Sequence, residues 1–288
     1  MKGKNVMKNK ISGKIVALLL TLIIVATSGM PLYAKETGDK ANSFRYENGQ
    51  SIAKAVPFST LSPNAWKKID GKYYSGDGSV IEGAVAKGID VSHHQGTVDW
   101  KKAKEDGVEF AIIRCGFGMN QTKQDDAQWF NNVKGCEENN IPYGVYLYSY
   151  ADTVKKAQSE AEHVLRLIKG HTLAYPVYYD IEEKAVLNKL TAEQLGKIAA
   201  TFVNKVKAEG YQTGIYSNKS NFETFLTDSQ FSQWNKWVAQ YNSAACTYKG
   251  TYQIWQAADT GTIDGVNGAV DINFAMKTTS SSDNNPGT

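Results

Sequence analysis

Cysteine and proline are scarce in this chain, which has three cysteines and six prolines among its 288 residues. Cys115, Cys136 and Cys246 are odd in number and form no CxxC pair, so the sequence supports neither a disulfide framework nor a zinc site. We therefore expect three buried thiols. The few prolines and the 25 glycines exclude collagen-like and proline-rich scaffolds.

Motifs that bind cofactors or create a nucleophile are also missing. The sequence contains no phosphate loop, no nucleophile elbow and no dinucleotide-binding fingerprint. Asp90 and His93 could begin a metal site, but no second pair of ligands is clustered near them in the sequence. We expect His163 and His171 to be surface residues. The sequence therefore predicts no metal and no cofactor.

Acidic residues are absent from the first 34 residues, which contain five lysines. The apolar run Ile15–Thr27 follows these lysines, and small and helix-breaking residues continue to Ala34. This order is typical of a secretory signal peptide, here residues 1–34. An uncleaved N-terminal anchor is the alternative, because Ile15–Ala34 carries no charge and is long enough to span a bilayer. We predict a secreted, extracellular protein, with association with the cell wall as a further option. It contacts the membrane only through this segment, if the segment is uncleaved.

The net charge of the chain is a property of this first segment. Without its five lysines the formal net charge of +3 becomes −2. A mildly acidic exported protein lacks the basic surface that nucleic-acid binding requires, so we expect no nucleic-acid partner.

Three further segments flank or connect the regular part of the chain. Residues 35–63 are polar and weakly patterned, which predicts a linker, and the Ser/Thr/Asn-rich residues 278–288 predict a disordered tail. Residues 64–86 contain Trp66–Tyr74, which resembles one unit of the aromatic wall-binding repeats of secreted bacterial proteins. Because a repeat unit needs stacked neighbours, we expect a short hairpin that packs on the next domain, with wall binding as the alternative.

Residues 87–277 alternate apolar runs with helical periods, which predicts βα units around a largely parallel sheet. The clearest helix is Thr191–Glu209, where Thr191 and Gln194 form a capping box. After Trp237 the gaps between apolar runs are too short for full helices. The pattern therefore predicts an α/β barrel whose last third lacks helices. The expected strands are 88–91, 110–115, 143–148, 177–181, 213–216, 237–240, 252–255 and 270–274, with a second clear helix at 153–169.

Paired carboxylates occur near the end of one predicted strand. Asp180 and Glu182 are two residues apart, so a strand points them to the same face. Two adjacent carboxylates cannot both ionise freely, which raises the pKa of one of them. Glycoside hydrolysis needs such a pair, one protonated and one ionised. The alternative is structural: either acid could cap a loop or pair with Arg114.

Aromatic residues on the same strands favour a carbohydrate ligand, because sugars offer apolar ring faces and hydroxyl groups. The alternative is that these rings fill the barrel interior. The candidate sugar contacts are Tyr148, Tyr178, Tyr216, Tyr241 and Gln256.

Five segments, in order along residues 87–277, are similar to those of glycoside hydrolase family 25, the Chalaropsis-type lysozymes. They are KGIDVSHHQG at 87–96, VDW at 98–100, FAIIRCG at 110–116, YYDIE at 178–182 and VDINF at 270–274. The resemblance implies a flattened TIM-like (β/α)5β3 barrel. It also implies an N-acetylmuramidase, which cleaves the β-1,4 bond between N-acetylmuramic acid and N-acetylglucosamine in peptidoglycan glycan strands.

The resemblance also implies roles for four acids. Glu182 matches the general acid that protonates the leaving oxygen. Asp180 matches a carboxylate that supports the positive charge or orients the substrate acetamido group. Asp90 and Asp271 match two further acids that line the cleft. Their implied roles are to hydrogen-bond to the sugar and to adjust the pKa values of Asp180 and Glu182. We expect the enzyme to act as a monomer.

Two rival interpretations remain open. A chitinase-type hydrolase of N-acetylglucosamine polymers carries the motif DxxDxDxE, but aligning its last acid on Glu182 places Tyr175 and Tyr178 at its first two acidic positions. An inactive wall-binding module on the same scaffold is the other possibility, since a fold does not guarantee activity. Loss of a catalytic acid would indicate such a module, and all four acids are present.

Overall fold

The computed structural model describes residues 46–47, 50–51, 61–241 and 243–277. The predicted signal peptide at 1–34 and the predicted tail at 278–288 lie outside the described residues, as does most of the predicted linker. Among the described residues, none of the helices is both long enough and apolar enough to cross a bilayer.

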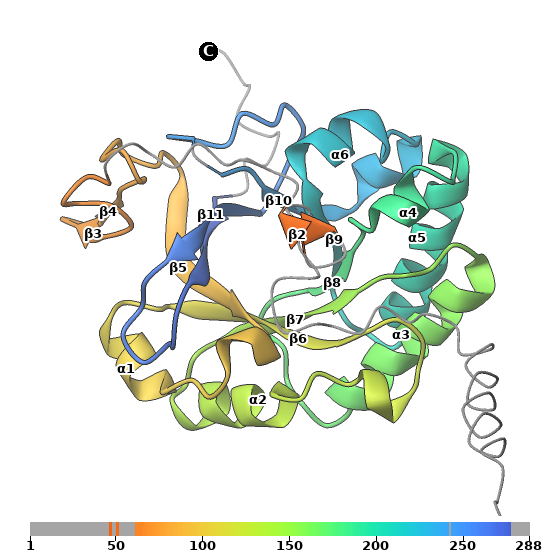
Figure 1. The fold of residues 1–288 in the computed structure, drawn as a ribbon, viewed down its shortest axis with the longest axis horizontal. Coiled ribbons are helices and arrows are strands. Elements are labelled where there is room, and N and C mark those ends of the chain that lie inside the picture. Colours follow the sequence, from red (N-terminus) through yellow and green to blue (C-terminus); the bar gives the residue numbers. More distant parts are fainter. Residues whose placement is uncertain (1–45, 48–49, 52–60, 242, 278–288) are drawn as a thin grey trace, which may run out of the picture. The chain divides into compact units, whose positions relative to one another are not determined.

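Eight strands of the described residues close into one barrel (Figure 1). Neighbouring strands are parallel from β5 through to β11, and β12 runs antiparallel to both β11 and β5. The strands are β5 (Ala84–Val91), β6 (Phe110–Phe117), β7 (Tyr143–Tyr148), β8 (Val177–Asp180), β9 (Thr213–Asn218), β10 (Asn235–Ala239), β11 (Ile254–Gly261) and β12 (Val270–Met276).

Helices separate the first six of these strands and cover the outside of the barrel (Figure 1). They are α1 (Trp100–Glu105), α2 (Trp129–Glu138), α3 (Val154–Ile168), α4 (Lys184–Leu187), α5 (Ala192–Ala208) and α6 (Lys219–Thr224), with short 3-10 turns at His93–Gln95, Thr122–Gln124 and Ser229–Gln233. The described residues between β10 and β11, and between β11 and β12, contain no helix. The barrel with a helix-free last third is therefore confirmed, and it has the (β/α)5β3 order.

The predicted capping box at the start of α5 is present. The Thr191 hydroxyl accepts from the backbone N–H of Gln194 at 3.3 Å, and the Gln194 side chain accepts from the backbone N–H of Thr191 at 2.9 Å. The buried face of the helix includes Phe202, whose ring stacks on Tyr179 of β8 with centroids 3.9 Å apart. Local sequence thus fixes where this helix begins, and an aromatic pair fixes how it packs on the strand.

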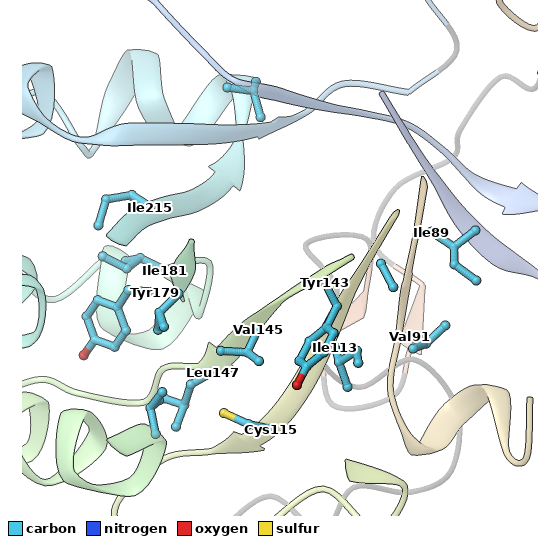
Figure 2. Packing of buried hydrophobic residues seen from close by; sticks show 14 of the residues in the cluster. Ile89, Val91, Ile113, Cys115, Tyr143, Val145, Leu147, Tyr179, Ile181 and Ile215 are labelled. Atoms are coloured by element: carbon cyan, nitrogen blue, oxygen red, sulfur yellow. The ribbon is translucent and has the colours of Figure 1, made fainter. Parts of the chain in front are cut away.

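Side chains alternate between two cores along the strands. One core lies between strands and helices, and Figure 2 shows several of its residues, from Ile89 on β5 to Ile215 on β9. The other fills the barrel interior and includes Ile112, Tyr178 and Trp237. Apolar and aromatic side chains therefore fill the barrel interior. The carboxyl end of the barrel is where polar side chains are expected.

A short hairpin precedes the barrel, formed by β3 (Lys68–Ile69) and β4 (Lys72–Tyr73). The Tyr73 ring lies 5.7 Å from the ring of Phe274 on β12. Its hydroxyl donates to the Val85 carbonyl at 3.1 Å and also to Glu109, which Lys68 contacts at 2.7 Å. The hairpin is thus fastened to the barrel by aromatic packing and an ionic hydrogen-bond cluster. A separate two-residue pairing joins β1 (Tyr46–Glu47) and β2 (Gln50–Ser51).

Candidate active site

The four acids singled out in the sequence come together at the carboxyl end of the barrel. Asp90 lies near the end of β5, Asp180 ends β8, and Glu182 follows two residues later. Asp271 is near the start of β12, which runs antiparallel, so this start lies at the same end of the barrel. Asp271 pairs directly with Asp90 in the sheet register.

Asp180 is a buried acid without hydrogen-bond support at one oxygen. Its side chain is 1% exposed, and Oδ1 has no hydrogen-bond partner among the described residues. Burial raises the pKa of Asp180 well above its usual value, and the charges of Glu182 and Asp90 raise it further, while Arg114 lowers it. Ionisation of Asp180 beside a charged Glu182 is therefore disfavoured.

Asp90 belongs to a buried polar network. Its Oδ2 accepts from Gln256 Nε2 at 2.8 Å and from Asn273 Nδ2 at 2.7 Å. Burial raises the pKa of Asp90 to about 6, although the hydrogen bonds from Asn273, Gln256 and Asp271 act in the opposite direction. Asp90 is thus a buried carboxyl whose ionised form is supported by neutral donors.

The aromatic residues proposed from the sequence have different surroundings. Tyr216 and Tyr241 both donate to Gln256 Oε1, at 2.8 and 2.6 Å. Gln256 is only 2% exposed and joins both tyrosines to Asp90. These three residues line the acidic site as one hydrogen-bonded unit, and direct contact with a sugar stays a prediction for each.

Tyr148 and Tyr178 lie at different depths in the barrel. Tyr148 is paired in register with Asp180, is 3% exposed, and donates its hydroxyl to Glu183 at 3.1 Å. Tyr178 is 0% exposed and lies one residue pair deeper, where its ring is 5.4 Å from that of Trp237. This placement favours barrel filling for Tyr178, the alternative that the sequence had left open, and its sugar contact stays a prediction that the packing does not support.

Arg114 forms a buried ion pair beside the site. Its Nε donates to Asp126 Oδ2 at 2.7 Å, and the same oxygen accepts from the backbone N–H of His93 at 3.0 Å. Burial opposes ionisation of Asp126, but the Arg114 charge outweighs it together with the hydrogen bonds, and the pKa of Asp126 falls to about 2. Asp126 was not singled out in the sequence, because its partners, Arg114 on β6 and His93 in the turn after β5, are brought to it only by the fold.

The expectation that His163 is a surface residue is wrong. Its side chain is 0% exposed, Nδ1 lies 3.0 Å from the Gly118 carbonyl oxygen, and Nε2 lies 2.8 Å from Asp125. On α3, positions 160, 164 and 167 are buried, so residue 163 lies on the same inward face. The polar ends of the ring find partners in the loop after β6. His171, by contrast, is partly exposed and pairs with Glu137.

Two residues of the network were missed, namely Asn273 and Trp237. Trp237 Nε1 donates to Asn273 Oδ1 at 2.8 Å. Asn273 could have been found, since it follows Asp271 by two residues on one strand and therefore shares its face. Trp237 offered no such signal, because a tryptophan in an apolar run indicates only packing.

The three cysteines and the arrangement of metal-ligating side chains also bear on the expectations from the sequence. Cys115 and Cys136 are buried free thiols, and Cys246 is a half-buried free thiol. Within the described ranges, no group of three or more histidine, cysteine or acidic side chains is arranged to hold a metal ion.

Comparison with known proteins places this geometry in a family. The model of Glycosyl hydrolases family 25 matches residues 89–266. The uncharacterised protein YegX of Escherichia coli K12 is 31% identical over 193 residues, which cover 65% of this chain and 68% of YegX. The autolytic lysozyme of Clostridium acetobutylicum is 27% identical over 186 residues, which cover 65% of this chain and 54% of that protein.

A solved structure with the same fold is the modular autolysin LytC of Streptococcus pneumoniae in complex with a synthetic peptidoglycan ligand. It is 31% identical and superposes with a TM-score of 0.63, covering 73% of this chain. This chain spans 51% of that autolysin, about half its length.

Proposed function

This chain is a glycoside hydrolase of family 25, and from that premise we propose that it hydrolyses bacterial peptidoglycan. We propose the β-1,4 bond between N-acetylmuramic acid and N-acetylglucosamine as the bond it cleaves. The buried Asp180–Glu182 pair at the carboxyl end of the barrel carries the proposal, because burial and the charge of Glu182 raise the pKa of Asp180 and so disfavour ionisation of both carboxyl groups together. The names of the relatives, a lysozyme and an autolysin, support the same substrate.

Glu182 is the general acid in this proposal. It gives its proton to the glycosidic oxygen as the bond to the sugar breaks, and the departing sugar leaves as an alcohol. When Glu182 carries the proton, its charge no longer acts on Asp180, so Asp180 can ionise and face the positive charge that develops on the sugar ring. Asp180 acts either directly on that charge or by orienting the acetamido group of the substrate.

Asp90 and Asp271 are proposed to support this pair electrostatically. The charge of Asp90 raises the pKa of Asp180, and this further disfavours ionisation of Asp180 beside a charged Glu182. Tyr148, Tyr216 and Tyr241 surround the acids from β7, β9 and the end of β10, and we propose them as contacts for the sugar rings. The five lysines and the apolar run at the start of the chain support action outside the cell.

A turbidity assay on purified cell walls tests the proposal. The full chain should clear the walls, and Glu182→Gln should lower the rate by about 10²–10⁴-fold, because the amide cannot donate the acidic proton. Glu193→Gln makes the same chemical change at an exposed position of α5 and should clear walls at the parental rate.

The outcomes separate the alternatives. If the full chain clears nothing but sediments with the walls, the binding-module interpretation replaces this one. If Glu182→Gln clears at the parental rate, the catalytic assignment is wrong. Mass spectrometry of the new reducing ends should find N-acetylmuramic acid, and terminal N-acetylglucosamine would overturn the bond assignment.

A further inference from the structure

Two buried amides donate to the same oxygen of Asp90. Asn273 Nδ2 lies 2.7 Å and Gln256 Nε2 lies 2.8 Å from Asp90 Oδ2. The three side chains are 0%, 2% and 4% exposed, so water does not compete for these contacts. A carboxyl oxygen that accepts two N–H groups has both lone pairs occupied, which leaves none for a proton of its own. Oδ2 of Asp90 is therefore only an acceptor.

The orientation of the Asn273 amide follows from its other partner. The indole N–H of Trp237 lies 2.8 Å from Asn273 Oδ1. An indole nitrogen can only donate, so it requires the amide oxygen on its side. The amide nitrogen must then face Asp90, and a rotation of the amide by half a turn would set two donors against each other.

Gln256 is oriented by two hydroxyl groups. Tyr216 donates to Gln256 Oε1 at 2.8 Å and Tyr241 donates to the same oxygen at 2.6 Å. The amide oxygen is thus saturated by two donors, and the amide nitrogen is directed toward Asp90. Either hydroxyl alone would be enough to hold this orientation.

Asp271 completes the network from the neighbouring strand. It is paired in register with Asp90 between β12 and β5, and a hydrogen bond between the two carboxyl groups contributes to the pKa of each. Two carboxyl groups can share a hydrogen bond only if one proton lies between them. Donors to Asp90 favour its charged form, so the proton belongs on Asp271. Burial, and then the charge of Asp90, raise the pKa of Asp271 well above its usual value.

We propose that Asn273 and Gln256 are positioning residues that hold Asp90 as a hydrogen-bond acceptor and thereby keep the shared proton on Asp271. The inference deepens the proposed function and rests on it for its effect on catalysis: a fixed negative charge at Asp90 acts on Asp180. The other titratable groups that act on Asp90, Asp271 or their neighbours include Arg114, Tyr146, Asp180, Glu182, Tyr216, Asp259 and Tyr241.

Infrared spectroscopy of the full chain without substrate tests the location of the proton. At neutral pH the spectrum should contain protonated-carboxyl bands, and Asp271→Asn should remove one of them. Asn273→Leu keeps the side-chain size but removes a donor to Asp90. It should raise the pH at which the Asp90–Asp271 pair takes up its second proton by about one unit or more, the effect expected for one hydrogen bond to a charged group.

Tyr241→Phe is the matched control for the amide orientation. Tyr216 still donates to Gln256 in this variant, so the second proton should be taken up at the parental pH. On cell walls, the acidic limb of kcat/KM for Asn273→Leu should move to higher pH with the infrared midpoint, because Asp90 is then neutralised earlier. If Asn273→Leu only disturbed packing, kcat/KM would fall but the acidic side of its pH profile would not move.

Two results would overturn the inference. Asp271→Asn could leave the protonated-carboxyl bands unchanged, or Asn273→Leu could leave unchanged the pH at which the pair takes up its second proton. If Asn273→Leu does not fold, carbon NMR of labelled aspartates in the parental chain decides, and Asp90 must then lose its proton at lower pH than Asp271. The infrared and NMR spectra are recorded without substrate and do not depend on enzymatic activity. A chain that clears no walls therefore refutes the proposed function and leaves this inference to its own test.

Discussion

Glu160 on α3 accepts a hydrogen bond at 2.5 Å from the hydroxyl of Tyr179, the residue next to Asp180 on β8. The same carboxyl accepts from the Ser149 hydroxyl at 2.8 Å and from the backbone N–H of Tyr150 at 2.9 Å. A single buried acid on the outside of the barrel therefore joins the ends of two strands whose inner faces carry Tyr148 and Asp180.

Stability should depend on pH through Glu160. Burial raises its pKa from 4.5 to about 7, so its contribution to stability is complete below the unfolded pKa and is lost as the pH rises through about 7. In the parent, we expect the free energy of unfolding to fall by about 3 kcal/mol over this pH range. Glu160→Gln should reduce this fall, because the amide does not ionise. Urea unfolding at several pH values measures it. Glu162→Gln, at an exposed position of α3, should keep the parental pH dependence.

Asp180→Asn should separate activity from stability. The rate of wall clearing should fall by about 10²–10⁴-fold, because the carboxylate that faces the developing charge is lost. The raised pKa of Asp180 means that its ionisation weakens the fold as pH rises, so the variant should be more stable than the parent in alkaline buffer. Thermal melting at neutral and alkaline pH checks this. If the exposed control Asp264→Asn gained the same thermal stability in alkaline buffer, the explanation would be contradicted.

Asp126→Asn should destabilise the fold strongly. The substitution leaves the charge of Arg114, which is 1% exposed, without its buried partner, and we expect a loss of about 3–5 kcal/mol in the free energy of unfolding. In the parent, the lowered pKa means that this ion pair stabilises the fold above the unfolded pKa and is lost as pH falls through about 2. Chemical denaturation measures the difference. Glu138→Gln breaks an exposed pair with Lys134 and should change little.

Tyr73→Phe should loosen the hairpin without touching the acidic site. The phenyl ring can still pack on Phe274, but the hydrogen bonds to Val85 and Glu109 are lost. We expect a decrease of about 1–2 kcal/mol in the free energy of unfolding, and wall clearing at the parental rate. Hydrogen exchange at the β4 amides should increase. A fall in the rate with unchanged stability would instead assign the hairpin a direct role on the substrate.

Local patterns were sufficient for most of the fold. Thr191 of the capping box lies one residue before the helix and Gln194 is the third residue within it, and the predicted helix 191–209 is observed as Ala192–Ala208. Short gaps after Trp237 correctly predicted a helix-free last third. Strand ends were less accurate: β11 begins at Ile254 and runs to Gly261, beyond the predicted 252–255. Its pairing with β12 contains register shifts, which depend on the partner strand.

The sequence by itself determined the acids and their order along the chain, because the motifs that contain them are local. Asp271 was placed at the same end of the barrel as the other three acids only by the antiparallel direction of β12, which the tertiary structure decided. Only the tertiary structure decided what each acid experiences. Asp90 is held by Asn273 and Gln256, which are far away in the sequence, and His163 faces inward from α3 to partners in the loop after β6. A pKa depends on burial and on neighbouring charges, and both arise only when distant strands close into a barrel.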